Sequence, residues 1–186
     1  MVKRIVRYIA GTIHLGLRYK KGRSSELSLL GYTDSDHSGD LVHRKSTSGM
    51  VFYLGSSLVT WASQKQKVVT LSTCEAEYVA AAAGACQGVW LSMLVADLIG
   101  NEVQKFKLLV DNKSAIELSK NLVHHGRSKH IDTRFHYIRE CIEKGVVDVD
   151  HVGTEDQLAD ILTKPLGRIR FVELRSRLGV VQVQQD

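Results

Sequence analysis

Four acidic residues occupy positions from which their carboxylates can meet in one cleft: Asp34, Glu77, Asp111 and Asp160. An isolated carboxylate is costly to bury in an apolar core, whereas an acid at the end of a strand or near the start of a helix can face a cleft. Several carboxylates in one cleft repel each other unless divalent cations neutralise them. Ligand sets made only of oxygen favour Mg2+ or Mn2+. We therefore expect these acids to form a site for such ions.

Two of the acids directly follow apolar runs that predict β-strands. Residues 27–33 end before Asp34, and residues 106–110 end before Asp111. Both acids are therefore expected at the carboxyl ends of strands. In open α/β sheets the ligand crevice usually lies at that edge.

The predicted helix at 73–99 offers two glutamates, and its capping pattern distinguishes them. Ser72 followed three residues later by Glu75 is a capping box, in which the Glu75 side chain returns to the backbone N–H of the cap residue. Glu77 lies about 200 degrees around the helix from Glu75 and so belongs to another face. We assign Glu77 to the metal site, with Glu75 as the alternative.

Capping patterns also place the last two acids. Thr154 and Gln157 form a second capping box, which leaves Asp160 free in the next turn. Asn112 is expected to cap the helix that begins after Asp111.

Strand and helix patterns alternate along the rest of the chain, which predicts an α/β fold in the order β-β-β-α-β-α-α-β-α. The expected strands are 27–33, 49–54, 58–62, 106–110 and 146–152, and the expected helices are 73–99, 113–119, 132–143, 155–162 and 168–178. Residues 55–57 join the second and third strands as a hairpin. Residues 182–186 are expected to form a frayed end.

Composition limits the class of protein. The 186 residues are 44% hydrophobic and 24% charged, which suits one domain with a substantial core. The net charge of +5 favours a polyanionic partner without deciding it. Three widely spaced cysteines predict reduced thiols of an intracellular protein. No stretch reaches the roughly 18 apolar residues of a spanning helix, so we expect a soluble chain without a membrane partner.

The first 25 residues are basic, with no acid before Glu26, and their apolar side chains share one helical face. An organellar presequence has a similar pattern. An amphipathic helix followed by a connector explains it more simply.

Several motifs, in order along the chain, together resemble the ribonuclease H domain of copia-type LTR-retrotransposon polyproteins, from near residue 3 to about residue 178. They are Tyr32-Thr-Asp-Ser-Asp36 with Gly39-Asp40, Arg44-Lys-Ser-Thr-Ser-Gly49, Ser63-Gln-Lys-Gln66, Ser72-Thr-Cys-Glu-Ala-Glu-Tyr78, Val110-Asp-Asn-Lys-Ser-Ala115, Lys129-His-Ile-Asp132 and Gln157-Leu-Ala-Asp-Ile-Leu-Thr-Lys164. The chain departs from the family at His37, where an aromatic residue is common, and at Gly153, where proline is common.

The resemblance implies a ribonuclease H-like fold, with a mixed five-stranded sheet flanked by helices. It implies cleavage of the RNA strand of an RNA/DNA hybrid to 5′-phosphate and 3′-hydroxyl ends. The catalytic metal quartet of the family falls on the four acids, and its mobile histidine falls on His151. Two ions, Mg2+ or Mn2+, would activate water and stabilise the leaving oxygen.

Basic residues in two regions are expected to grip the phosphates of the hybrid. They are Arg127, Lys129, His130 and Arg134 in the connector after residue 120, and Arg44 and Lys45 with Ser46 on the hairpin side. For each of these residues, the alternative is a solvent-exposed side chain that binds no phosphate. Four histidines in the region 124–136 fit no standard zinc spacing.

The resemblance also implies a place in a longer polyprotein. Residues 1–25 would be the tail of the upstream reverse transcriptase, residues 26–165 the ribonuclease H-like domain, and residues 166–186 a C-terminal helix and frayed tail. The reverse transcriptase and the hybrid would be its partners, in a retroelement particle of the cytoplasm or in the nucleus. A degenerate, non-cleaving nucleic-acid-binding module and an integrase-like strand transferase are the competing functions; the order of Glu77 and Asp111 favours the ribonuclease.

Overall fold

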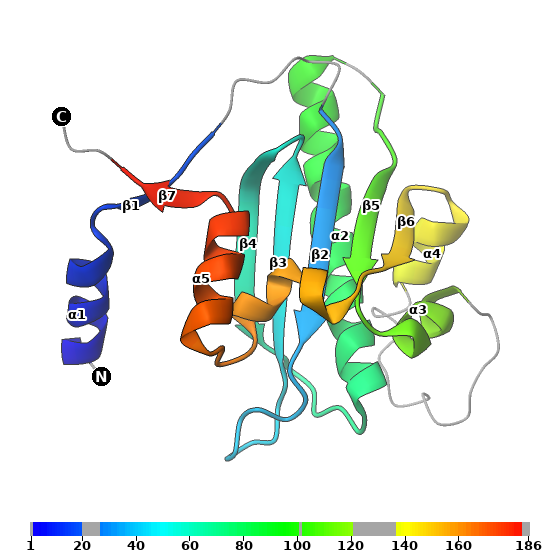
Figure 1. Ribbon diagram of the computed structural model, residues 1–186. Coiled ribbons are helices and arrows are strands. Elements are labelled where there is room, and N and C mark those ends of the chain that lie inside the picture. Colours follow the sequence, from blue (N-terminus) through cyan, green and yellow to red (C-terminus); the bar gives the residue numbers. More distant parts are fainter. Residues whose placement is uncertain (1, 20–26, 101, 121–136, 184–186) are drawn as a thin grey trace.

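A mixed sheet forms the centre of the protein in the computed structural model, which describes residues 2–19, 27–100, 102–120 and 137–183. Within these residues the sheet has five strands in the order β4-β3-β2-β5-β6 (Figure 1). Their bounds are β2 Leu29–Ser35, β3 Thr47–Leu54, β4 Ser57–Lys65, β5 Phe106–Val110 and β6 Val147–His151. The pairs β2–β3 and β3–β4 are antiparallel, whereas β2–β5 and β5–β6 are parallel. The mixed five-stranded sheet predicted from the sequence is confirmed.

Helices cover both faces of this sheet. On one face, α2 (Thr73–Ile99) packs with α3 (Lys113–Lys120) and α4 (Tyr137–Glu143) around a core that includes Phe52, Leu108 and Ile138. On the other face, the 3-10 helix η5 (Leu158–Leu162), which follows η4 (Thr154–Asp156), lies against β2 and β3, and the helix α5 (Arg168–Arg177) packs against η5. Leu174 of α5 is fully buried there in a second core cluster with Val51 and Leu58.

Helix α2 is apolar around much of its circumference because its sequence is rich in alanine and leucine. By length and composition alone it could cross a membrane, contrary to the expectation that no stretch qualifies, but more than half of the relevant stretch is buried inside the protein. The Ser72 side chain caps its first turn, and Gly100 ends it in the left-handed conformation. Its burial against the sheet explains the apolar composition.

Two glycines of α2 set how closely this helix approaches the sheet. A Cβ atom built on Gly84 would lie 2.3 Å from Thr33 Cγ2, and one on Gly88 would lie 2.2 Å from Phe106 Cε2. Neither distance is compatible with a real side chain. The close packing of α2 against β2 and β5 therefore requires glycine at both positions.

A further pair of strands joins the two ends of the described chain. Strands β1 (Leu15–Leu17) and β7 (Val180–Gln182) form a separate antiparallel sheet. These strands were not predicted, because three-residue strands leave little periodicity and residue 182 was expected in a frayed end. The N-terminal helix α1 (Val2–Thr12) was predicted; none of its residues is buried, and Figure 1 shows it beyond α5.

Candidate metal centre

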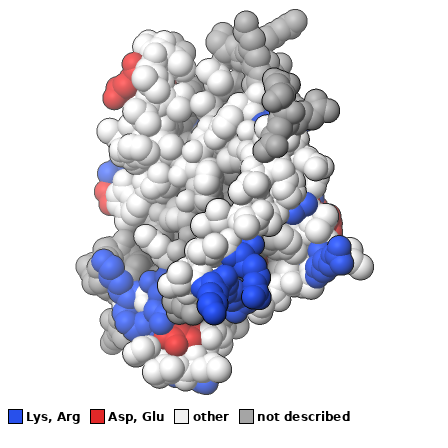
Figure 2. All heavy atoms as spheres, turned by 90° about the vertical axis from the view of Figure 1, so that its left-hand side faces the viewer, with Lys and Arg blue, Asp and Glu red and all other residues white. Residues whose placement is uncertain are grey.

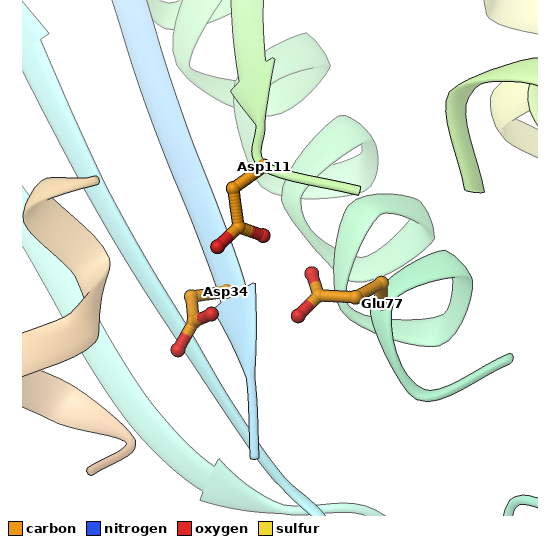
Figure 3. Close-up of side chains that lie close together, drawn as sticks. All are labelled: Asp34, Glu77 and Asp111. Atoms are coloured by element: carbon orange, nitrogen blue, oxygen red, sulfur yellow. The ribbon is translucent and has the colours of Figure 1, made fainter. Parts of the chain in front are cut away.

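Three of the four predicted acids converge at one edge of the sheet. Asp34 lies on β2, Glu77 on the first turns of α2, and Asp111 directly after β5. One carboxylate oxygen from each lies within 4.8 Å of the others. Figure 3 shows the three carboxylates pointing toward one another. Asp34 and Glu77 are buried, and Asp111 is partly exposed.

The register of the sheet explains this convergence. Thr33 of β2 pairs with Val110 of β5 in a parallel ladder, so the residues that follow them, Asp34 and Asp111, reach the same edge. Strand β2 extends to Ser35, two residues beyond the predicted run. Asp34 therefore lies within the strand, where the backbone fixes its position. The Asn112 side chain accepts the N–H of Ala115 at 3.0 Å and caps α3, as predicted.

Glu77 is held by the backbone of β2. Its Oε1 accepts the N–H of Ser35 at 3.0 Å, whereas its Oε2 is buried without a hydrogen-bond partner among the described residues. Burial, followed by the charges of Asp34 and Asp111, raises the pKa of Glu77 to about 9. Burial and then the Asp34 charge likewise raise the pKa of Asp111. The negative charge of the neighbouring carboxylates is therefore not fully compensated by positive charge in the protein.

Glu75 has a different task. The Ser72 hydroxyl accepts the Glu75 N–H at 3.2 Å, and the Glu75 carboxylate accepts the N–H of Leu71 at 2.7 Å. The reciprocal partner is thus Leu71, one residue before the cap, and not Ser72 as predicted. Glu75 still stabilises the helix start and lies outside the acidic cluster of Asp34, Glu77 and Asp111.

Asp160 adjoins this cluster through a lysine. The Lys164 Nζ lies 2.6 Å from Asp160 Oδ1 and 3.0 Å from Asp34 Oδ1, and the Thr163 hydroxyl donates to the other oxygen of Asp34. Burial raises the pKa of Asp160 against the opposing effect of Lys164. Burial works to lower the pKa of Lys164, but its bonds to Asp160 and Asp34 outweigh that effect and raise it.

The segment that carries Asp160 departs from the predicted helix 155–162. It forms two 3-10 helices, and the second capping box is absent. Gln157 is instead fully buried: its Nε2 donates to the Thr33 carbonyl at 2.8 Å and its Oε1 accepts the N–H of Ala159 at 3.2 Å. This bond from the core overrides the local capping pattern and fastens η5 to β2.

A buried amide connects the strand and helix that carry Asp34 and Glu77. The Gln66 Nε2 lies 3.1 Å from Ser35 Oγ, 2.9 Å from Ser48 Oγ and 2.9 Å from the Ala76 carbonyl. Ser35 follows Asp34, and Ala76 precedes Glu77. The family motifs include Gln66 and Lys164, but local sequence gives no sign of the roles of these side chains, because their partners lie far away along the chain.

His151 lies at the end of β6, where it pairs with Val110, the residue before Asp111. Its side chain is exposed at the same edge of the sheet as the acids. The resemblance assigned the mobile histidine of the family to this residue, and that role stays a prediction.

The hairpin-side residues differ in their exposure. Arg44 is exposed in a turn with a positive φ of 55°, and Lys45 is partly exposed. Ser46 is fully buried, its Oγ accepts the Ser38 N–H at 3.0 Å, and it lies 3.3 Å from Thr70 Oγ1. Ser46 therefore stabilises the loop, and the expectation that it contacts phosphate does not fit this burial. The other predicted contacts, Arg127, Lys129, His130 and Arg134, lie outside the described residues.

Basic side chains also occur beyond these two regions. Figure 2, which faces the side of α1 and α5, shows Lys and Arg gathered in separate groups over the lower half of the molecule, with few acidic side chains among them. The strand end that carries Asp34 points toward that lower half in Figure 1.

The chemistry of these groups suits a hard divalent cation. Three carboxylates supply the oxygen ligands that Mg2+ and Mn2+ prefer. One buried oxygen, Glu77 Oε2, lacks a hydrogen-bond partner among the described residues, so a cation bound there would satisfy it.

Comparison with known proteins gives close relatives but no matching family model. The chain is 42% identical over 182 residues to the retrovirus-related Pol polyprotein from transposon RE1 of Arabidopsis thaliana, covering 98% of this chain and 12% of that protein. It is 38% identical over 179 residues to the Pol polyprotein from transposon TNT 1-94 of Nicotiana tabacum, covering 96% of this chain and 13% of that protein. The chain thus spans about an eighth of the length of these relatives.

Among solved structures, the N-terminal ribonuclease H domain of Rv2228c from Mycobacterium tuberculosis has a TM-score of 0.48 and 16% identity, covering 81% of this chain and 97% of that chain. The sheet described above has the mixed, helix-flanked arrangement that the sequence motifs implied. The chain therefore corresponds, over nearly its whole length, to one segment of the copia-type retrotransposon Pol polyproteins.

Proposed function

We propose that this domain hydrolyses the RNA strand of RNA/DNA hybrids in a reaction that depends on divalent metal ions. The observation that carries the proposal is the meeting of Asp34, Glu77 and Asp111, from three separate elements, with carboxylate oxygens within 4.8 Å of each other. A purely structural role would not favour three neighbouring carboxylates of which two are buried.

The residues of the chain have distinct tasks in this proposal. Asp34, Glu77 and Asp111 would hold one Mg2+ or Mn2+ ion, and Asp34 with Asp160 would hold a second. Bound there, the ions would supply an activated water and charge stabilisation for the leaving 3′ oxygen. Ser35 orients Glu77 through its N–H at 3.0 Å. His151, exposed at the same edge, would serve proton transfer or product release.

The hybrid would bind across this edge through its phosphates. Arg44 and Lys45 are available on the hairpin side, and the connector after residue 120 carries Arg127, Lys129, His130 and Arg134. Phosphate contacts position a nucleic acid, and the 2′-hydroxyl distinguishes its RNA strand. In the longer polyprotein the upstream reverse transcriptase would supply the hybrid.

The test is cleavage of a labelled RNA/DNA hybrid beside matched RNA and DNA duplexes, with Mg2+, Mn2+ or EDTA. We expect metal-dependent cutting of the RNA strand of the hybrid alone, lost in Asp34→Asn. The matched control is Asp148→Asn, because this acid lies half exposed on β6 and pairs only at 3.5 Å with Lys105. Binding of the hybrid without cutting would support the non-cleaving module instead, and an active Asp34→Asn variant would refute the site.

A further inference from the structure

Lys164 occupies the space between two carboxylates that the proposed function assigns to a metal ion. Its Nζ lies 2.6 Å from Asp160 Oδ1 and 3.0 Å from Asp34 Oδ1. The side chains of Asp34 and Asp160 are 0% and 6% exposed, whereas that of Lys164 is 36% exposed. One partly exposed ammonium group is therefore shared by two buried carboxylates and compensates part of their charge.

We propose that Lys164 is an internal counter-cation, which joins Asp34 to Asp160 in the metal-free domain and must move away before a divalent ion binds between them. The inference rests on the proposed function, because it concerns the second of its two ions. It predicts that the ions bind in order, first at Asp34, Glu77 and Asp111 and then beside Asp160.

The local backbone supports this role. The N–H groups of Thr163 and Lys164 both donate to the Asp160 carbonyl, at 3.2 Å and 3.0 Å. This tight turn keeps Lys164 beside Asp160 whatever the ammonium group does. The lysine stem is long and flexible, and its partly exposed side chain has a path to solvent. Displacement therefore needs rotation of one side chain and no change of the fold.

The carboxylates of the two proposed ion positions differ in whether a described cation pairs with them. Lys164 contacts Asp34 and Asp160, whereas Glu77 and Asp111 have no ion pair with a described cation. A first divalent ion meets two carboxylates, Glu77 and Asp111, that have no ion pair with a described cation, and it shares only Asp34 with Lys164. A second ion beside Asp160 meets the two carboxylates that Lys164 joins, so its apparent affinity includes the loss of both lysine contacts.

The matched control comes from the end of α4 and the residue that follows it. Lys144 Nζ lies 2.6 Å from Glu140 Oε1 at the same spacing of four residues as Lys164 and Asp160, but both side chains are more than half exposed. Lys144→Met removes the same kind of pair at an exposed position outside the acidic cluster of Asp34, Glu77 and Asp111. It reports the general effect of losing a lysine.

The experiment measures Mn2+ binding by the paramagnetic resonance signal of the free ion, together with thermal unfolding in EDTA. For Lys164→Met we expect the weaker of two Mn2+ affinities to rise about tenfold and Tm in EDTA to fall by about 5 °C. Lys144→Met should change neither. An unchanged or weakened second affinity in Lys164→Met would overturn the proposal, as would a wild-type protein that binds no Mn2+ or a single ion.

A second variant keeps the test decisive if Lys164→Met does not fold. Lys164→Arg retains the charge and gains a planar fork that suits two carboxylates, so it should weaken the second Mn2+ affinity relative to wild type. An equal or tighter affinity would contradict the proposal. Because the readout is metal binding, a domain that shows the expected affinities but cuts no hybrid would refute the proposed function alone. A domain that cuts the hybrid with affinities indifferent to Lys164 would refute this inference alone.

Discussion

The backbone N–H of Ser35 donates to the Glu77 carboxylate across 42 residues of sequence, at 3.0 Å. This bond ties the start of α2 to the end of β2, and the second oxygen of Glu77 has no hydrogen bond among the described residues. The Glu77 carboxylate lies close to those of Asp34 and Asp111 (Figure 3). Several expectations follow from the charge at this point.

Stability without metal should depend on pH through Glu77. Because its pKa is raised from 4.5 to about 9, the folded state retains a proton that the unfolded chain releases. The free energy of unfolding in EDTA should therefore fall as pH rises between these values, by up to about 1.4 kcal/mol per pH unit. Urea unfolding across this range measures it. Glu77→Gln should flatten the fall and Glu75→Gln should not; equal slopes in all three proteins would contradict the assignment.

Two acids of the same site should respond differently to neutralisation. Asp111→Asn removes a charge that repels its neighbours, so Tm in EDTA should rise by about 3 °C. Asp34→Asn relieves the same repulsion but loses the ion pair with Lys164 at 3.0 Å, so it should be less stabilising. Calorimetry of both variants in EDTA checks the difference. Equal stabilisation would mean that the Lys164 contact contributes nothing.

Gln66 should matter to stability and to metal binding alike. Gln66→Leu leaves the Ser35 and Ser48 hydroxyls and the Ala76 carbonyl without their buried amide partner, which should cost about 3 kcal/mol. Because Gln66 joins the residues beside Asp34 and Glu77, Mn2+ affinity should fall as well. Gln64→Leu, at an exposed position of β4 two residues before Gln66, is the control. Wild-type Mn2+ affinity in Gln66→Leu would show that the amide positions neither acid.

Gln157 should stabilise the segment that carries Asp160. Gln157→Leu removes the buried bond to the Thr33 carbonyl at 2.8 Å and should lower the free energy of unfolding by about 2 kcal/mol. Urea unfolding measures the loss. Gln182→Leu, at an exposed position of β7, should have little effect, and comparable losses in the two variants would argue against a special role for the buried amide.

On the hairpin side, Arg44 and Lys45 are expected to contact phosphate, whereas their neighbour Ser46 stabilises the loop. If Arg44 and Lys45 grip the hybrid, Arg44→Ala with Lys45→Ala should reduce the salt dependence of binding by about one to two units of slope. Ser46→Ala should leave that slope unchanged and lower stability by about 1 kcal/mol, because Ser46 is buried and bonded to Ser38. Hybrid affinity measured at several salt concentrations distinguishes the two. An unchanged slope in the double variant would refute the contact.

Sequence predicted most of the framework of the site but not the groups that fasten it. The acids Asp34 and Asp111 were found because strands end beside them, and the bounds of α2 follow from its caps. The contacts of Gln66 and Lys164 join residues far apart along the chain. The spacing of residues in the local sequence does not reveal such partners. The capping box at Thr154 was wrong for a related reason: a carbonyl in the core competes for Gln157.

The glycines of α2 bear on how mutation could disrupt the acidic cluster in related copies of this retrotransposon segment. Gly84 faces Thr33, the neighbour of Asp34, and lies about 10 Å along the helix from Glu77. Any larger residue there pushes the helix, and Glu77 with it, away from the sheet. A copy can therefore lose the close meeting of its carboxylates while all four acids remain intact in its sequence. The close packing of α2 on the sheet therefore decides whether the acids of a copy can still meet, as much as the presence of the acids does.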